Sequence, residues 1–187
     1  MSALRRIPQE YVEYLLCRFV REAEEVQGRI RMQKVVFLVG EGDCPLFNDY
    51  FYHLRGPYSP ALARTLGRLV DNGLLDEQTE DLGAERVQYH YKLSDRGGQV
   101  LERFERHQFL RGAVDLGNRY VPRFLGLASH RVRELELAAT LAYWKKQGYS
   151  WKEAADITAE LKAATQGSDE LVSAKQLATE ACAGSGG

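Results

Sequence analysis

The stretch that decides the fold reads GPYSPALARTLGRLVDNG and occupies residues 56–73. Ser59 is a favourable N-cap, and Pro60 suits the first helical position, where a missing N–H is not needed for a hydrogen bond. Gly73 accepts the left-handed conformation that often follows a helix end. The stretch therefore predicts a helix from Pro60 to about Asn72.

The predicted helix has two unlike faces. Its apolar face comprises Leu62, Leu66, Leu69 and Val70. Arg64 and Arg68 lie four residues apart on the opposite face, which places both side chains on one solvated stripe. Because a recognition helix presents basic side chains opposite its core face, the pattern is compatible with contact to DNA.

Working outward from this helix, the sequence predicts a winged arrangement. Helical periodicity covers residues 8–27 and 29–39. Residues 87–93 alternate apolar and polar side chains, which predicts a strand. An acidic turn over residues 76–85 precedes it, and residues 74–77 could pair with it to form a hairpin. Ser94 or Asp95 then caps a further helix. Helix, helix, capped helix, β-hairpin, helix is the order of a winged helix-turn-helix, so the predicted class is mainly α with a small β-hairpin (α+β).

The sequence as a whole predicts four parts. Residues 1–110 form the winged helix-turn-helix-like domain with its N-terminal helix. Three glycines and Pro122 interrupt residues 111–128, which we expect to be a connector. Residues 129–183 form a C-terminal helical extension that contains the capping-box pattern of Ser150 and Glu153. The glycine-rich residues 184–187 are expected to be a disordered tail.

The composition is that of a water-soluble protein. Of the 187 residues, 44% are hydrophobic and 27% charged, and the net charge is −1. No apolar run approaches the length of a membrane span, and the N-terminus lacks the apolar stretch of a signal peptide. We therefore expect a cytoplasmic protein with no membrane partner. A nucleic-acid role would have to depend on a local basic patch, because the chain as a whole is not basic.

The motifs of common enzymes are missing. The three cysteines and four histidines are scattered without metal-ligand spacing, and no phosphate-binding loop or nucleophile elbow occurs. The sequence predicts a non-enzymatic protein with no catalytic residue, no cofactor and no metal.

Two motifs carry a resemblance to known families. Met32-Gln33-Lys34, within the apolar run 31–40, precedes the segment 47–54 and then the turn Gly56-Pro57-Tyr58-Ser59. These stretches resemble the YwgA-like family of bacterial proteins, over most of the chain, and the related Panacea (SocA-type) antitoxin domain, over about residues 11–75. The Panacea resemblance implies a module that neutralises a toxin or presents a partner to a protease. Separately, residues 69–75 and 91–97 are similar to winged-helix regulators of the MarR and PadR type.

Two functions follow as hypotheses. The first is a winged-helix DNA-binding regulator of transcription that contacts duplex DNA through Arg64, Thr65 and Arg68, with Arg55 nearby on the phosphate backbone. For this function we expect a homodimer. A solvated helix face with two arginines is the simpler alternative.

The second hypothesis is a protein-binding adaptor or antitoxin-like module with a toxin-like or regulatory partner protein. The predicted wing is acidic, and carboxylates repel phosphates. The partner-binding candidates are Tyr58, Asp76, Glu77, Glu80 and Asp81. For Tyr58 the alternative is packing within a capped turn.

Overall fold

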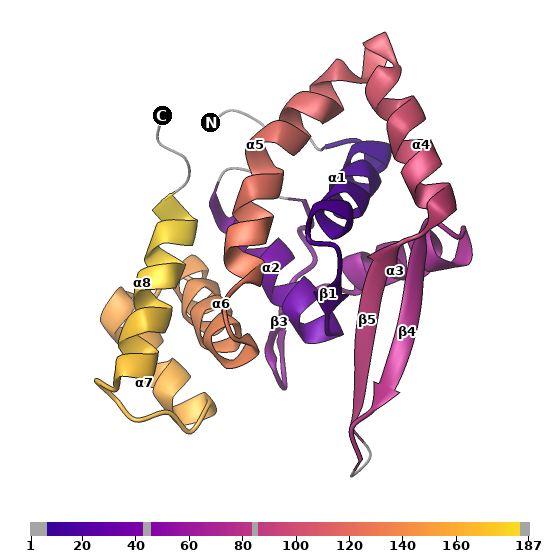
Figure 1. Ribbon diagram of the computed structural model, residues 1–187. Helices are drawn as coiled ribbons and strands as arrows, with labels where there is room; N and C mark the ends of the chain where they lie inside the picture. The colour runs from indigo at the N-terminus through magenta and orange to yellow at the C-terminus, as the bar shows by residue number, and fades with distance from the viewer. Residues whose placement is uncertain (1–6, 43–45, 84–85, 184–187) are drawn as a thin grey trace. The chain divides into compact units, whose positions relative to one another are not determined.

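The computed structural model describes residues 7–42, 46–83 and 86–183. The protein is mainly helical with two small antiparallel sheets, which confirms the α+β class (Figure 1). It divides into two compact units, each built from two chain segments. Unit 1 takes residues 1–32 and 61–128, and unit 2 takes residues 33–60 and 129–187. The predicted tail at 184–187 lies outside the described residues.

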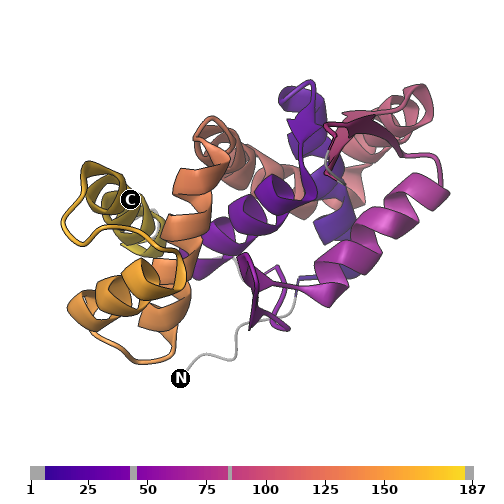
Figure 2. The same cartoon turned by 90° about the horizontal axis from the view of Figure 1, so that it is seen from below.

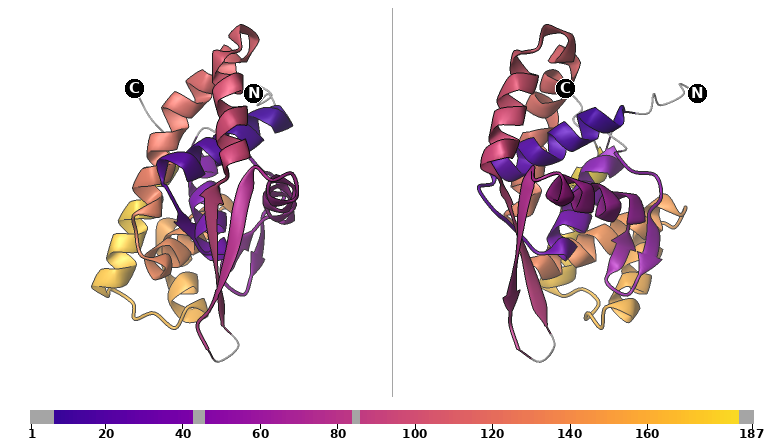
Figure 3. Two further views of the ribbon diagram at one scale, coloured as in Figure 1. Left: turned by 45° about the vertical axis from the view of Figure 1, so that its right-hand side comes forward. Right: turned by 90° about the vertical axis from the view of Figure 1, so that its right-hand side faces the viewer.

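Unit 1 contains the predicted hairpin with helices before and after it. Its elements are α1 (Gln9–Glu22), β1 (Val26–Gln27), the first turn of α2 (Arg29–Gly42), α3 (Pro60–Asp71, from Ala61 onward), β4 (Leu75–Asp81), β5 (Val87–Leu93), α4 (Asp95–Arg106), the short 3₁₀ helix η1 (Gln108–Leu110) and α5 (Arg111–Ala128). The sheet order is β1-β5-β4 with antiparallel neighbours. Both views of Figure 3 show the β4–β5 hairpin extending away from α1 and α4.

Local chemistry sets the junctions around the hairpin. Helix α3 ends at Asp71, and Gly73 follows with a φ of 66° while its N–H donates to the carbonyl of Val70. At the start of α4 the hydroxyl of Ser94 accepts from the N–H of Gly97 at 2.9 Å, so Ser94 is the N-cap. The acidic segment predicted as a turn is mostly strand, because residues 76–81 pair along β5.

The first helix is shorter than predicted. It ends at Glu22, and Glu24 adopts a left-handed φ of 60° that turns the chain into β1. There Val26 pairs with Tyr91 of β5 and is buried. The apolar character of Val26 therefore reflects a strand position rather than a continued helical stripe.

The predicted connector over residues 111–128 is instead the continuous helix α5. It packs along α1, where the Phe19 and Phe124 rings stack with centroids 5.1 Å apart. A Cβ on Gly117 would lie 3.1 Å from the Tyr14 ring and 2.5 Å from the Arg18 guanidinium. The glycine that suggested a break thus permits close helix packing.

In unit 2 the two C-terminal helices α7 and α8 pack on the central helix α6. Its elements are the rest of α2, β2 (Phe51–His53), β3 (Gly56–Tyr58), α6 (Val132–Lys146), α7 (Trp151–Leu161) and α8 (Asp169–Ala183). Helix α6 contacts α7, α8 and β3, and Figure 2 shows α6, α7 and α8 gathered together in orange and yellow. The predicted capping box of α7 is present, with Ser150 and Glu153 each bonded to the other's backbone N–H.

The division differs from the predicted boundary near residue 110. Residues 33–60, which the sequence analysis assigned to the N-terminal domain, belong with the C-terminal helices in unit 2. The buried run of α2, Val35 to Val39, contributes to the core of unit 2, where the Phe37 ring centroid lies 4.9 Å from that of Tyr50 and 6.5 Å from that of Tyr143. In the described part of the chain, no helix is long and apolar enough to cross a lipid bilayer.

Candidate functional site

Helix α3 carries the basic residues predicted to contact DNA. Its buried face consists of Leu62, Thr65, Leu66 and Leu69. Arg64 and Arg68 are exposed on the other side of the helix. The helical repeat thus brings these two predicted residues together on one open face.

The two arginines differ in their surroundings. The Arg68 guanidinium pairs with the Glu13 carboxylate of α1 at 3.1 Å, and half of its side chain (50%) is exposed. Arg64 has no ion pair with any residue that the structure describes. Because an exposed ion pair contributes only about 0.2–1 kcal/mol, Arg68 can exchange Glu13 for another anion at little cost.

Thr65 was predicted among the DNA contacts, and its position rules this out. Only 2% of the residue is exposed. Its hydroxyl accepts from the Gln9 amide and from Arg68, each at 3.3 Å. Thr65 therefore fixes the packing of α3 on α1 and does not reach an external ligand.

Arg55 belongs to unit 2, whereas Arg64 and Arg68 belong to unit 1. It lies in the turn between β2 and β3, and its guanidinium is 3.5 Å from the Glu136 carboxylate of α6. Arg55, predicted to lie near the arginines of α3, is thus in a different compact unit from them.

The acidic residues of the hairpin fall into two groups. The Glu77 carboxylate is hydrogen-bonded within unit 1: both its oxygens accept from Arg29 at 3.0 Å, and one accepts from the Tyr91 hydroxyl at 2.5 Å. Asp76, Glu80 and Asp81 are exposed along β4. Of the four predicted acidic partner-binding residues, these three are exposed.

Two of the exposed carboxylates also have local contacts. Glu80 is 3.3 Å from Nε2 of His90, and Asp81 accepts from the N–H of Gly83 at 2.8 Å. A hydrogen bond with Glu25 raises the pKa of His90, with a smaller contribution from Glu80. Hydrogen bonds from His90 and Lys92 lower the pKa of Glu25 to about 2.

Tyr58 takes part in an aromatic cluster of the β2–β3 hairpin. Its ring centroid lies 5.8 Å from that of Phe51 and 5.7 Å from that of His53. Tyr58 is half-buried, whereas Phe51 and His53 are exposed. The predicted residue is therefore partly accessible, as one ring of three.

The two motifs that carry the family resemblance meet inside unit 2. The Gln33 side chain donates to the Ser59 carbonyl at 3.0 Å and accepts from the Ser59 N–H at 2.9 Å. The Ser59 hydroxyl donates to Asp49. The Lys34 ammonium donates to the Pro57 carbonyl at 2.7 Å. The motif residues on α2 thus supply the hydrogen bonds that the backbone of the Gly-Pro-Tyr-Ser segment requires.

Lys34 lies in a buried polar cluster that the sequence analysis did not identify. The residue is 2% exposed, and its pKa is lowered to about 7. Burial is the main cause; the Glu136 charge opposes it, and the Lys162 and Arg55 charges act in the same direction as burial. Gly56 has a φ of 91°, and a Cβ there would lie 2.8 Å from the Thr140 hydroxyl. The available signal was a lysine within the apolar run 32–39, where a charged residue needs a specific partner.

The described residues hold no group of three histidine, cysteine, aspartate or glutamate side chains arranged to bind a metal ion. Burial, and to a lesser extent the Glu13 charge, raises the pKa of the Cys17 thiol to about 12, so this thiol is protonated and unreactive at neutral pH.

The comparisons with known proteins point to one family. No family model matches the chain. Over 115 residues the chain is 30% identical to a protein of Bacillus subtilis (strain 168) that bears the name "Uncharacterized protein YwgA". The match spans 61% of this chain and 69% of that protein. The chain belongs to the YwgA family.

Proposed function

We propose that the protein is a non-enzymatic regulator that binds duplex DNA through a winged-helix domain in unit 1. In unit 1, α1, β1, the first turn of α2, α3, β4, β5 and α4 follow one another along the chain, with β2 and β3 of unit 2 inserted between α2 and α3. This order and the pairing of β1 with β5 support the assignment. In such a domain α3 is the recognition helix and β4–β5 is the wing. The observation that carries the proposal is the open face of α3 with Arg64 and Arg68.

The charge distribution limits how the protein would hold DNA. The exposed carboxylates of β4 oppose a wing contact to phosphates, so α3 supplies most of the affinity. Two arginine–phosphate contacts give a logarithmic salt slope of about −1.8. Binding to random DNA is therefore expected to be weak and to require low salt. A homodimer would join two such helices and raise the avidity. Sedimentation velocity tests the homodimer, and a monomer at the concentration where DNA is bound contradicts it.

The test is fluorescence anisotropy of a labelled random-sequence duplex at about 50 mM salt, where phosphate contacts are strong. Wild type is compared with Arg64→Ala, Arg68→Ala and the double variant. Lys175→Ala, an exposed lysine of α8, is the matched control for the loss of one positive charge. The proposal requires binding that the double variant weakens and the control retains. No binding by the wild type contradicts it.

A specific feature of the hairpin favours a second candidate, a protein-binding adaptor or antitoxin-like module. Next to the exposed carboxylates, Leu82 and Val87 are also exposed. Asp81 and Val87 are paired in the hairpin, so the acidic and apolar side chains are neighbours. Such a surface suits a basic partner protein with an apolar patch. The resemblance to Panacea domains supports the same candidate.

Cross-linking in cells, followed by mass spectrometry, tests this candidate. The adaptor candidate is supported if a partner protein is cross-linked through residues 76–82 of the wild type and this cross-link is absent with the Leu82→Ser/Val87→Ser variant. Equal cross-linking by both proteins contradicts the use of the hairpin.

A further inference from the structure

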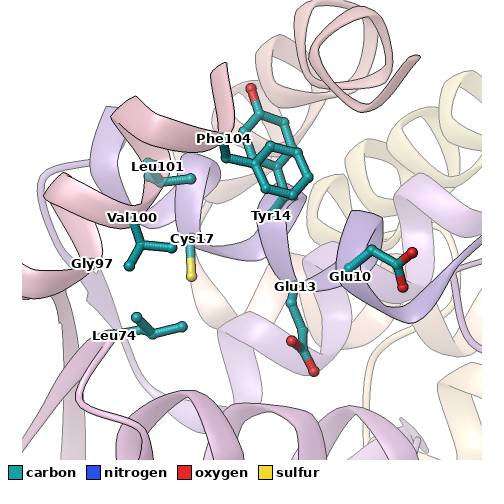
Figure 4. A pocket seen from close by; sticks show the side chains of 9 residues that line it. All are labelled: Glu10, Glu13, Tyr14, Cys17, Leu74, Gly97, Val100, Leu101 and Phe104. Carbon is teal, nitrogen blue, oxygen red and sulfur yellow. The ribbon is translucent and has the colours of Figure 1, made fainter. Parts of the chain in front are cut away.

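Unit 1 contains a pocket of about 210 Å³ between α1 and α4. Its apolar wall includes Leu74, Val100, Leu101 and Phe104, and two carboxylates of α1, Glu10 and Glu13, also line it. Figure 4 shows the two glutamates on one side and Leu74, Val100 and Leu101 on the other. Because a cavity of roughly 150 Å³ accepts benzene, this pocket has room for one aromatic ring with a short side chain.

The packing of α4 keeps the pocket open. Near the N-terminus of α4, Gly97 approaches the backbone so closely that a Cβ would lie 2.2 Å from the Leu74 carbonyl oxygen. About two turns further on, Phe104 stacks on Tyr14 with centroids 4.6 Å apart. Between these two contacts Val100 is 40% exposed. The helix is therefore fixed at both ends of the pocket, and an apolar side chain is left uncovered in the middle.

The charge of the pocket is negative. The Cys17 thiol is neutral, and the Tyr14 hydroxyl is occupied by Arg18 and Glu105, at 3.2 Å each. Glu10 has no ion pair with a residue that the structure describes. Glu13 has Arg68 as its only ion-pair partner among the described residues. An apolar wall with carboxylates at its edge is complementary to a small organic cation with an apolar body.

We propose that the pocket binds a small aromatic or branched aliphatic amine as its ammonium ion, and that this ligand competes with Arg68 for Glu13. The ammonium group pairs with the Glu13 carboxylate, and the apolar body covers Val100 and Phe104. Arg68 then loses its partner and stays on the open face of α3. The binding step is independent of the proposed function. The effect on DNA rests on the proposed function: once the ligand occupies Glu13, Arg68 no longer has to give up that ion pair to contact a phosphate, and the ligand strengthens DNA binding.

Isothermal titration of the full chain with 2-phenylethylammonium tests the binding step. 2-Phenylethanol and phenylacetate serve as neutral and anionic probes of similar size. We expect the amine to bind, the alcohol to bind about tenfold more weakly because it lacks the charge-assisted contact, and the carboxylate not to bind. Glu13→Gln weakens the amine about five- to tenfold and leaves the alcohol unchanged. Equal binding of the three probes, or no binding up to millimolar concentrations, overturns the proposal.

Filling the pocket gives a second, independent variant. Val100→Trp abolishes binding of the amine, whereas Val172→Trp, at an exposed valine of α8, leaves it unchanged. Circular dichroism of both variants checks that they are folded. If Val100→Trp is unfolded, Val100→Phe takes its place, and undiminished binding by a folded pocket variant overturns the site.

The coupling step is measured separately, by anisotropy of the labelled duplex with and without the amine. The coupling is supported if the amine strengthens DNA binding by the wild type and leaves DNA binding by Glu13→Gln unchanged. Unchanged DNA binding in wild type overturns the coupling but not the pocket. A protein that binds the amine and never binds DNA contradicts the proposed function alone.

Discussion

Replacement of Lys34 by methionine should change how the stability of the protein depends on pH. Lys34 is 2% exposed and donates to the Pro57 carbonyl, and burial lowers its pKa from 10.5 to about 7. In the unfolded chain the pKa returns to its ordinary value. Between these two values the unfolded state therefore binds a proton that the folded state does not bind.

The sign and size follow from this difference. A lysine whose pKa is lowered on folding contributes stability that is fully present above 10.5 and is lost as the pH falls through about 7. Across that window the contribution changes by about 1.36 kcal/mol per pH unit, about 5 kcal/mol in all. Between about pH 7.5 and 9, the wild type should gain about 2 kcal/mol relative to Lys34→Met.

Urea unfolding at a series of pH values measures the effect. The quantity of interest is the difference in the free energy of unfolding between wild type and Lys34→Met, because other titrating groups contribute equally to both. Lys175→Met, at an exposed lysine of the same unit, is the matched control and should follow the wild type at every pH.

A constant difference between wild type and Lys34→Met from about pH 7 to 9.5 would refute the reasoning, because a lysine with an ordinary pKa titrates above that range in both states. A difference that grows as the pH falls, with the wild type gaining relative stability, would contradict the sign and indicate that the charged form is the one favoured by the fold.

Three further predictions concern unit 1. Gly97→Ala should destabilise the protein by about 1–3 kcal/mol, because the added Cβ overpacks against Leu74. Gly98→Ala, whose Cβ meets nothing within 4 Å, should stabilise the protein by about 0.5–1 kcal/mol. Equal effects of the two variants in thermal unfolding would exclude the close contact at Gly97. His90 should titrate by NMR with a midpoint above pH 6.5, and Glu25→Gln should lower that midpoint, because the hydrogen bond to Glu25 favours the charged ring. The stability from this pair is present below pH 6.5 and is lost as the pH rises through the raised pKa of His90. An unchanged midpoint in Glu25→Gln would contradict the prediction. Glu13→Gln should strengthen duplex binding while Arg68→Ala weakens it, since the first frees Arg68 and the second removes it; a loss of binding in Glu13→Gln would show that the ion pair is needed to position α3.

The elements that the sequence predicted best are those with local signals. Ser94 caps α4, Ser150 and Glu153 form the capping box of α7, and Pro60 begins α3. The hydroxyls of Ser94 and Ser150 each accept from a backbone N–H three residues later, and Pro60 lacks the N–H that a first helical residue would leave unbonded. Such interactions need no knowledge of the rest of the chain.

The features that were missed depend on contacts between distant segments. Gly117 reads locally as a helix breaker, but against Tyr14 and Arg18 it is the residue that lets α5 approach α1. Val26 continues a helical pattern in the sequence and pairs instead with Tyr91. Neither partner can be found by reading neighbouring residues.

The candidate site was predicted in part for the same reason. The helical repeat places Arg64 and Arg68 on one open face, but it also puts Thr65 near them although the side chain points into the core. The Glu13 partner of Arg68 and the pocket beside it come from the packing of α1 against α3 and α4, far away in sequence.

Photo-cross-linking from the open face of α3 tests the central claim most directly. A Cβ on Gly67, between Arg64 and Arg68, meets nothing within 4 Å, and the same holds for Gly126 on α5. Each is replaced in turn by p-benzoylphenylalanine, and the protein is irradiated with labelled duplex DNA at low salt. The account predicts a DNA cross-link from position 67 and none from position 126. A cross-link from 126 without one from 67, or from neither position, would contradict recognition of DNA by α3.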